Sequence, residues 1–170
     1  MKTIGILSDT HSCWDDRYAG HFAGCDEIWH AGDIGDYTII QKLRDVAPVI
    51  RAVSGNIDHG TVTRHCPAML IFETEGLRVL LTHVGGYPGK YFKGIPKLLA
   101  DNHIGLMVCG HSHILKVIPD HRLELLHINP GAAGWYGWQK VRTLIRITID
   151  NGRVTSLDVI ELAKGNGTEK

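Results

Sequence analysis

Short apolar stretches that end abruptly in polar residues are the feature that most constrains how this 170-residue chain can fold. In the first half of the chain these stretches alternate with a helical pattern, and in the second half they follow one another directly. Alternating strands and helices are typical of parallel βαβ units, whereas consecutive strands joined by tight turns form antiparallel pairs. The sequence therefore predicts a mixed α/β fold, in which two mixed β-sheets pack face to face with helices outside.

The spacing of the apolar residues gives the expected helices and strands. A helix over residues 36–47 is expected because apolar residues recur at helical spacing until Pro48, and a shorter helix is expected over 96–101. Glu75-Gly76 and Asn151-Gly152 indicate two antiparallel hairpins. The expected strands cover residues 3–7, 28–29, 49–53, 70–74, 77–82, 106–109, 116–118, 123–128, 142–149 and 153–162.

The composition, with 44% apolar and 21% charged residues, is that of an ordinary globular domain. We expect one domain over residues 1–162 and a loose tail over 163–170. The four cysteines form no C-x-x-C pair, which predicts reduced thiols.

The first apolar stretch is too short for a secretory signal, and no run approaches the ~20 apolar residues of a membrane span. We therefore expect a cytoplasmic protein.

Eleven histidines are more than a core or a solvated surface requires, and imidazole is a common metal ligand. Five polar clusters follow directly after predicted strands: Asp9-Thr10-His11, Gly32-Asp33, Gly55-Asn56-Ile57-Asp58, His83 and Gly110-His111-Ser112-His113. Taken singly, most of these clusters are better explained as turns or structural residues. Open α/β sheets gather their ligands beyond the carboxyl ends of the strands, so the five clusters together predict one site.

The candidate ligands are three carboxylates, four imidazoles and one amide. If one carboxylate binds both metal ions, seven of these eight side chains provide four protein ligands to each of two ions. Asp58 is then not needed as a ligand. Oxygen and nitrogen ligands without a thiolate suit divalent manganese, which we expect, or zinc, iron or nickel. A pair of cations about 3.5–4 Å apart acidifies a bridging water for in-line attack at phosphorus, so the expected reaction is phosphate ester hydrolysis.

The order D-x-H, G-D, G-N-x-D, H and G-H-x-H resembles the calcineurin-like metallophosphoesterase superfamily, and the short chain resembles its small prokaryotic phosphodiesterase family. The resemblance spans residues 4–131 and implies the family's four-layer sandwich of two mixed sheets flanked by helices. It implies catalytic roles for three residues, together with a hydroxide that bridges the metal ions: Asp33, Asn56 and His83. The implied ligands are Asp9, His11, Asp33 and His113 for the first ion, and Asp33, Asn56, His83 and His111 for the second.

Asp58 is expected to orient Asn56 or another ligand, because metal ligands usually have such hydrogen-bonding partners. Many members of the superfamily carry a histidine at the position of Ile57, where it is taken to protonate the leaving group. An apolar side chain cannot donate that proton, and general acid catalysis is commonly worth ~10² to 10⁴-fold. We therefore expect substrates whose leaving groups need little protonation, or a substitute acid.

Three residues near this motif are candidate substrate contacts. His59 and His65 are candidate substitute acids, and Arg64 is a candidate contact for the substrate phosphate. For the two histidines a position in a solvated loop is the more common explanation, and Arg64 could equally face water. A second departure from the family pattern is Val84-Gly85 after His83, where relatives often have Gly-His, and this leaves the local substrate contacts open.

The expected function is a dinuclear phosphodiesterase that acts on a small or nucleotide-like diester. A phosphomonoesterase with the same site is one alternative, and a non-catalytic metal-binding scaffold that resembles the retromer subunit is another.

The charge of the chain is balanced, with 18 Lys plus Arg residues and 18 Asp plus Glu residues, so no net electrostatic attraction favours nucleic acid or a membrane as partner. Self-association is possible, and Trp135, Tyr136 and Trp138 either serve such an interface or pack locally.

Overall fold

The computed structural model describes residues 1–163, which form two five-stranded sheets and four short helices. We name the sheet with strand order β10-β9-β1-β2-β3 sheet A, and the sheet with order β4-β5-β6-β8-β7 sheet B. The elements are β1 (Lys2–Leu7), α1 (Arg17–Phe22), β2 (Glu27–His30), α2 (Thr38–Arg44), β3 (Val49–Ala52), α3 (Thr61–His65), β4 (Met69–Thr74), β5 (Leu77–Thr82), α4 (Ile95–Asp101), β6 (Leu106–Val108), β7 (Leu115–Asp120), β8 (Leu125–Pro130), β9 (Val141–Asp150) and β10 (Arg153–Ala163).

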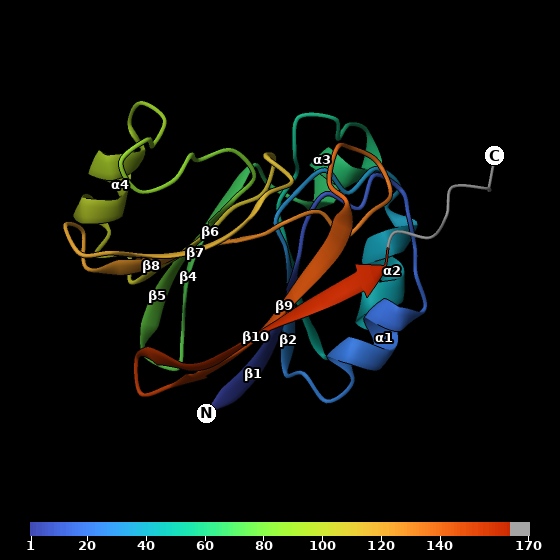
Figure 1. Cartoon of the computed structure of the whole chain (residues 1–170), viewed down its shortest axis with the longest axis horizontal. Coiled ribbons are helices and arrows are strands. Elements are labelled where there is room, and N and C mark those ends of the chain that lie inside the picture. The colour runs from blue at the N-terminus through green and yellow to red at the C-terminus, as the bar shows by residue number, and fades with distance from the viewer. Residues whose placement is uncertain (164–170) are drawn as a thin grey trace.

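Both sheets contain parallel and antiparallel pairs. In sheet A, β1 pairs with β2 and β2 with β3 in parallel, while β9 is antiparallel to β1 and β10. In sheet B, β5, β6 and β8 are parallel, and β4 and β7 are antiparallel edge strands. Figure 1 shows the two sheets packed together, with α1 and α2 on the outer side of sheet A and α4 on the outer side of sheet B. The predicted fold of two mixed sheets flanked by helices is confirmed.

All the expected strands and both expected hairpins are present, with bounds that differ by a few residues. The helices α1 and α3 were not predicted, because segments of six and five residues are too short to show helical periodicity. Strand β10 continues to Ala163, which was expected in the tail, and residues 164–170 of that tail lie outside the described part. None of the described helices is long and apolar enough to span a bilayer.

The core between the two sheets is made by alternate residues of their strands. Ile4 and Ile6 of β1 belong to the cluster between the sheets, whereas Leu7 belongs to the cluster under the helices of sheet A. This is the period of two expected for a strand buried on both faces. Trp29 of β2 packs edge-on against Phe72 of β4 at 5.1 Å between ring centroids, which joins the two sheets directly.

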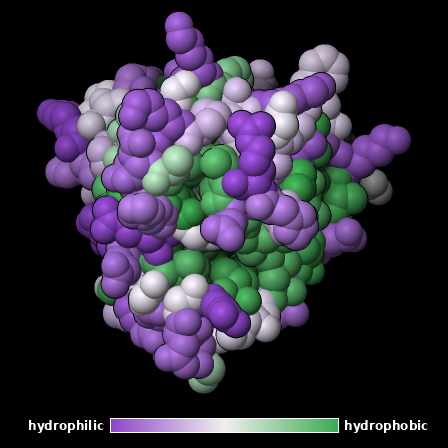
Figure 2. All heavy atoms as spheres, turned by 90° about the vertical axis from the view of Figure 1, so that its left-hand side faces the viewer, coloured by the Kyte–Doolittle hydropathy of each residue, from purple (hydrophilic) through white to green (hydrophobic). Residues whose placement is uncertain are grey.

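The outer face of sheet B is covered less completely than the outer face of sheet A. Ile95 and Leu99 of α4 pack with Leu80 and Met107 of sheet B in a third, smaller cluster. Figure 2 shows that this side of the molecule exposes a continuous apolar area between polar groups. The helices and sheets thus form four layers, of which the α4 layer is the thinnest.

A buried carboxylate connects strands of both sheets. Glu27 of β2 is only 1% exposed, and its two oxygens accept hydrogen bonds from Lys2 (2.8 Å), Arg51 (2.8 Å), Trp29 (2.9 Å) and Thr74 (3.3 Å). These partners come from β1, β3, β2 and β4, respectively. Burial alone would raise the pKa of Glu27, but the bonds from Arg51, Lys2 and Trp29 outweigh it and lower the pKa to about 2.

We predict that acid weakens the fold partly through Glu27. Because its pKa falls from 4.5 to about 2 on folding, its stabilising effect is complete above pH 4.5 and is lost as the pH drops toward 2. The Glu27→Gln variant loses a charged hydrogen-bond acceptor, so its free energy of unfolding at pH 7 should be lower by roughly 1.5–3 kcal/mol. Urea unfolding between pH 7 and pH 2.5 measures both effects.

The matched control is Glu161→Gln, on the exposed side of β10, with an expected change within about 0.5 kcal/mol at pH 7. The Glu27→Gln protein should also lose less stability than wild type between pH 4.5 and pH 2.5. Parallel curves for wild type and Glu27→Gln over that range would contradict the role of Glu27.

Candidate metal centre

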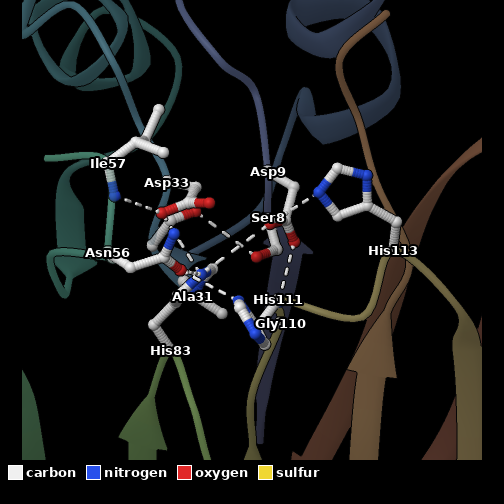
Figure 3. Close-up of polar contacts among 12 residues, drawn as sticks. Ser8, Asp9, Ala31, Asp33, Asn56, Ile57, His83, Gly110, His111 and His113 are labelled. Atoms are coloured by element: carbon white, nitrogen blue, oxygen red, sulfur yellow. Dashed lines mark hydrogen bonds and ion pairs between the residues drawn. The ribbon is translucent and has the colours of Figure 1, made fainter. Parts of the chain in front are cut away.

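The candidate ligands lie together at one edge of the two sheets, although they come from five places in the sequence. Parallel strands bring their carboxyl ends to the same edge of a sheet, and sheets A and B pack so that these edges meet. Figure 3 shows the side chains converging from both sheets. They follow the strands in this order: Asp9 and His11 after β1, Asp33 after β2, Asn56 after β3, His83 after β5, and His111 and His113 after β6.

A first group of possible ligands is formed by Asp9, His11 and His113, with one ligand atom of each within 4.8 Å of the others. His113 Nε2 lies 3.2 Å from Asp9 Oδ1, and the Asp9 carboxylate raises the pKa of His113. Burial lowers the pKa of His11, which favours the neutral imidazole that binds metals. This group therefore offers a carboxylate and two imidazoles to one cation.

A second group is formed by Asp33, His83 and His111, again within 4.8 Å of one another. The amide oxygen of Asn56 joins it, 3.0 Å from His83 Nε2 and 2.9 Å from His111 Nδ1. Burial disfavours the charged form of His83, but the neighbouring carboxylates of Asp33 and Asp9 outweigh it, so the pKa of His83 is raised. This second group offers one carboxylate, two imidazoles and an amide.

Asp33 lies between the two groups and faces both. Its Oδ2 atom is 3.5 Å from His11 Nε2 of the first group, and its Oδ1 atom is 3.2 Å from His83 Nε2 of the second. The Asp33 carboxyl is buried, which would raise its pKa, but the hydrogen bond and charge of His83 outweigh this and lower the pKa. Asp33 therefore stays ionised, with one oxygen available to each group.

Two buried atoms test whether these residues fit metal ions. Asp9 Oδ1 and His11 Nε2 are shielded from solvent and form no hydrogen bond in the described part of the protein. Other candidate ligands lie near both atoms, His113 Nε2 at 3.2 Å from Asp9 Oδ1 and Asp33 Oδ2 at 3.5 Å from His11 Nε2. A buried polar atom without a hydrogen bond is costly, and a bound ion is a common explanation. The donor set of carboxylates, imidazoles and an amide is also one that divalent transition metals prefer. The residues thus fit a pair of divalent cations.

Hydrogen bonds to the far side of two histidine rings fix which nitrogen faces the site. His83 Nδ1 donates to the carbonyl oxygen of Ala31 at 2.7 Å, and His113 Nδ1 donates to the amide oxygen of Gln139 at 3.2 Å. In the neutral rings, both Nε2 atoms then present a lone pair to the centre, as metal ligands do. Gln139 was not predicted, because nothing in the sequence connects it to a residue 26 positions away.

Asp58 supports the site through the backbone. Its carboxylate accepts hydrogen bonds from the N–H groups of Ile34 (3.0 Å), Gly35 (2.7 Å) and Gly55 (2.7 Å). It therefore ties the loop that carries Asp33 to the loop that carries Asn56. Asp58 is expected from the sequence to orient Asn56 or another ligand, and its hydrogen bonds act on the backbone of these two loops.

Two further buried residues, His30 and Asn129, contact the ligand loops. Asn129-Pro130-Gly131 also resembles the N-P-G segment of the family, whereas His30 was not expected at the site. His30 accepts a hydrogen bond from the Gly32 N–H at 3.2 Å and lies 3.0 Å from the Thr10 hydroxyl, and burial lowers its pKa to about 4. Asn129 of β8 donates to the carbonyl oxygen of Gly110 at 2.8 Å. Neutral His30 thus contacts the clusters that contain Asp9 and Asp33, and Asn129 contacts the cluster that contains His111.

The ligand loops have an unusual backbone conformation. Residues other than glycine seldom adopt positive φ, and when they do so at functional sites the surrounding structure compensates for the strain. Glycines beside the ligands permit close packing, since a Cβ atom at Gly55 would lie 2.1 Å from Asp33 Oδ1 and one at Gly110 would lie 2.8 Å from Asp9 Oδ2. The ligands with positive φ are Asp9 (54°), His11 (45°), Asp33 (52°), His111 (71°) and His113 (58°).

A cleft of about 530 Å³ is lined in part by the candidate ligands. Tyr136 and Trp138 line this cleft, and the Tyr136 ring lies 4.7 Å from the ring of His11 between centroids. From the sequence, both aromatic residues were expected in a self-interface or in local packing. Ile57 also lines the cleft, and its backbone N–H donates to Asp33 Oδ1 at 3.1 Å. The apolar Ile57 side chain is therefore next to the candidate centre.

The three candidate substrate contacts lie elsewhere. His59 lines a second, smaller hollow beside Tyr37, and the ring of His65 packs against the ring of Tyr37 at 5.0 Å. Arg64 donates to the Thr61 hydroxyl within α3. None of the three is among the described residues that line the cleft at the candidate metal centre.

The chain is similar to known proteins in sequence. Residues 1–152 match the calcineurin-like phosphoesterase superfamily domain. A probable metallophosphoesterase of Methanocaldococcus jannaschii is 30% identical over 136 residues, which cover 76% of this chain and 67% of that protein.

Two solved structures share the fold at low sequence identity. Vps29 from Entamoeba histolytica, complexed with Zn²⁺, has a TM-score of 0.74 and 13% identity and aligns over 96% of this chain and 99% of its own. The phosphoesterase Yfce from E. coli has a TM-score of 0.60 and 20% identity over 92% of this chain and 98% of its own. Since the family match spans most of the sequence, the chain belongs to the calcineurin-like phosphoesterase superfamily, as the motifs predicted.

Proposed function

We propose that this protein is a phosphodiesterase that depends on two divalent metal ions. Asp9, His11, Asp33 and His113 would hold the first ion, and Asp33, Asn56, His83 and His111 the second. The observation that carries this proposal is the position of Asp33, whose two carboxylate oxygens face one group each at 3.5 and 3.2 Å. Manganese is the expected metal, and zinc, iron or nickel would suit the same nitrogen and oxygen ligands.

The chemistry divides between the ions and the chain. When bound, two such cations acidify a water molecule for attack and neutralise charge on the phosphate. Asp33 stays ionised between the two groups, and the neutral amide of Asn56 adds an oxygen ligand without further negative charge. The hydrogen bond from His83 Nδ1 to the Ala31 carbonyl oxygen orients that ring so that Nε2 faces the site.

The residues that line the cleft favour a diester over a monoester. None of the described lining residues is Lys or Arg, so no permanently charged side chain there would pair with the second negative charge of a monoester, and only the metal ions would neutralise it. Ile57 cannot protonate a leaving group, which favours esters of acidic alcohols or phenols. The proposed substrate is therefore a small or nucleotide-like diester that carries one negative charge and has a good leaving group.

A non-catalytic scaffold is the second candidate, because the fold is similar to that of Vps29 at a TM-score of 0.74. The complete set of candidate ligands, with two groups that converge on Asp33, supports the enzyme instead. A cytoplasmic location, self-association and the lack of nucleic acid as a partner stay predictions from the sequence.

The first test compares two esters that release the same p-nitrophenolate. Manganese-loaded protein should hydrolyse bis-p-nitrophenyl phosphate faster than p-nitrophenyl phosphate, as measured by the absorbance of the product. Chelation by EDTA should abolish turnover, and added Mn²⁺ should restore it. Rapid hydrolysis of the monoester alone would replace the proposal with a phosphomonoesterase. Stoichiometric metal without turnover of either ester would favour the scaffold.

The second test distinguishes the proposed bridging role of Asp33 from the proposed supporting role of Asp58. Asp33→Asn should abolish activity and lower the metal content of both sites, because each group loses charge from the same carboxylate. Asp58→Asn should lower activity only about 10- to 100-fold, as is typical when a partner of the ligands is removed. Metal analysis and kcat/KM measure these effects, and Asp45→Asn, on the surface at the end of α2, is the control. Equal, mild losses in both variants would refute the bridging role.

A further inference from the structure

Two large aromatic side chains are exposed at the rim of the cleft. Residues 134–140, which we call the aromatic loop, precede β9 and contain Trp135, Tyr136 and Trp138. Trp138 is 99% exposed and Tyr136 is 68% exposed, yet both line the cleft at the candidate metal centre. Aromatic rings left in water beside a site gain free energy when a flat partner covers them. This pair is therefore a candidate surface for part of the substrate.

The start of the aromatic loop is fixed to the core. The ring of Trp135 lies over the guanidinium group of Arg142, at 3.8 Å. Arg142 is completely buried and donates to Asp15 Oδ2 at 2.6 Å and to the carbonyl oxygen of Ala133 at 3.1 Å. Tyr18 donates to the same Ala133 oxygen at 2.6 Å. The loop thus leaves the core from a rigid base.

The middle of the aromatic loop is attached to a candidate metal ligand. Gln139 accepts a hydrogen bond from His113 Nδ1 and donates from its amide nitrogen to the carbonyl oxygens of Tyr136 (2.7 Å) and Gly134 (3.1 Å). A Cβ atom at Gly137 would lie 2.3 Å from His113 Nδ1, so only glycine permits this close approach. The backbone of the loop is therefore held against His113, and the Tyr136 ring lies beside His11 of the candidate centre.

The rest of the cleft suits a substrate of low charge with an apolar part. Ile57, 38% exposed, adds a further apolar side chain to the lining. Beyond the candidate metal ligands, the described lining residues carry no formal charge: Ile57, Ser112, Tyr136, Gly137 and Trp138. A substrate that fits this lining presents its phosphate to the candidate ligands and a flat, uncharged ring to the aromatic loop.

We propose that Tyr136 and Trp138 bind a flat aromatic ester group of the diester, either an aryl group or a nucleobase, by stacking. This inference rests on the proposed phosphodiesterase function and specifies its substrate class. Stacking of one base on aromatic side chains commonly changes affinity by about 5- to 150-fold. A preference of that size separates diesters that carry a ring from diesters that carry only an alkyl group.

The test uses three diesters that all release p-nitrophenolate and differ only in the group that is retained. These are methyl p-nitrophenyl phosphate, bis-p-nitrophenyl phosphate and thymidine 5′-p-nitrophenyl phosphate. Wild-type protein should show a kcat/KM at least about fivefold higher for a ring-bearing ester than for the methyl ester. Trp138→Ala and Tyr136→Ala should lower this ratio, mainly through KM. Phe92→Ala, an aromatic residue that is 54% exposed and does not line the cleft, should leave the ratio unchanged.

The outcomes distinguish this inference from the proposed function. Equal kcat/KM for all three diesters in wild type, or a ratio that Trp138→Ala leaves unchanged, overturns the stacking role while the phosphodiesterase stands. A higher value for only the thymidine ester identifies a nucleobase, and a higher value for both ring-bearing esters identifies any flat ring. Failure to cleave any of the three refutes the phosphodiesterase itself.

Equilibrium binding tests the stacking role without turnover. Calorimetry should show that diphenyl phosphate binds the wild-type protein at least about fivefold more tightly than dimethyl phosphate. This difference should shrink in Trp138→Ala and persist in Phe92→Ala. Equal binding of the two phosphates to wild type would overturn the inference.

Discussion

The meeting of two sheets at the carboxyl ends of their parallel strands is the constraint on which the rest of the structure depends. Strands of both sheets end at this edge, and each delivers one or two ligands from the loop that follows it. No single segment holds the candidate centre, so its geometry depends on the core between the sheets, where residues such as Ile6 and Trp29 are completely buried. Asp33 lies where the two halves of the centre meet, with one oxygen toward each.

A second layer of hydrogen bonds makes this arrangement rigid. Asp58 ties two ligand loops together through their backbone, and the bonds from His83 to Ala31 and from His113 to Gln139 fix the ring orientations. Strained backbone at the ligands costs about 1–3 kcal/mol per residue, and such bonds help to hold it in place. Because Gln139 also braces the aromatic loop, the surface proposed to bind substrate and the proposed metal site share one support.

The sequence predicted the strands, their packing into two sheets and the convergence of the ligand clusters, because strand ends, glycines and metal-binding side chains follow one another in a recognisable order. It did not predict α1 or α3, which are too short to show periodicity. It also missed Gln139 and the place of Tyr136, whose contacts depend on how a loop folds back onto a distant histidine. Arg64 and His65 were chosen for their closeness to a motif in the sequence, but α3 places them outside the cleft.

If two cations share Asp33, anomalous scattering from crystals grown with Mn²⁺ should give two peaks per chain, both in contact with the Asp33 carboxylate. One peak should also contact Asp9 and His113, and the other His83 and His111. A single peak, or two peaks of which only one contacts Asp33, would rule out a shared carboxylate.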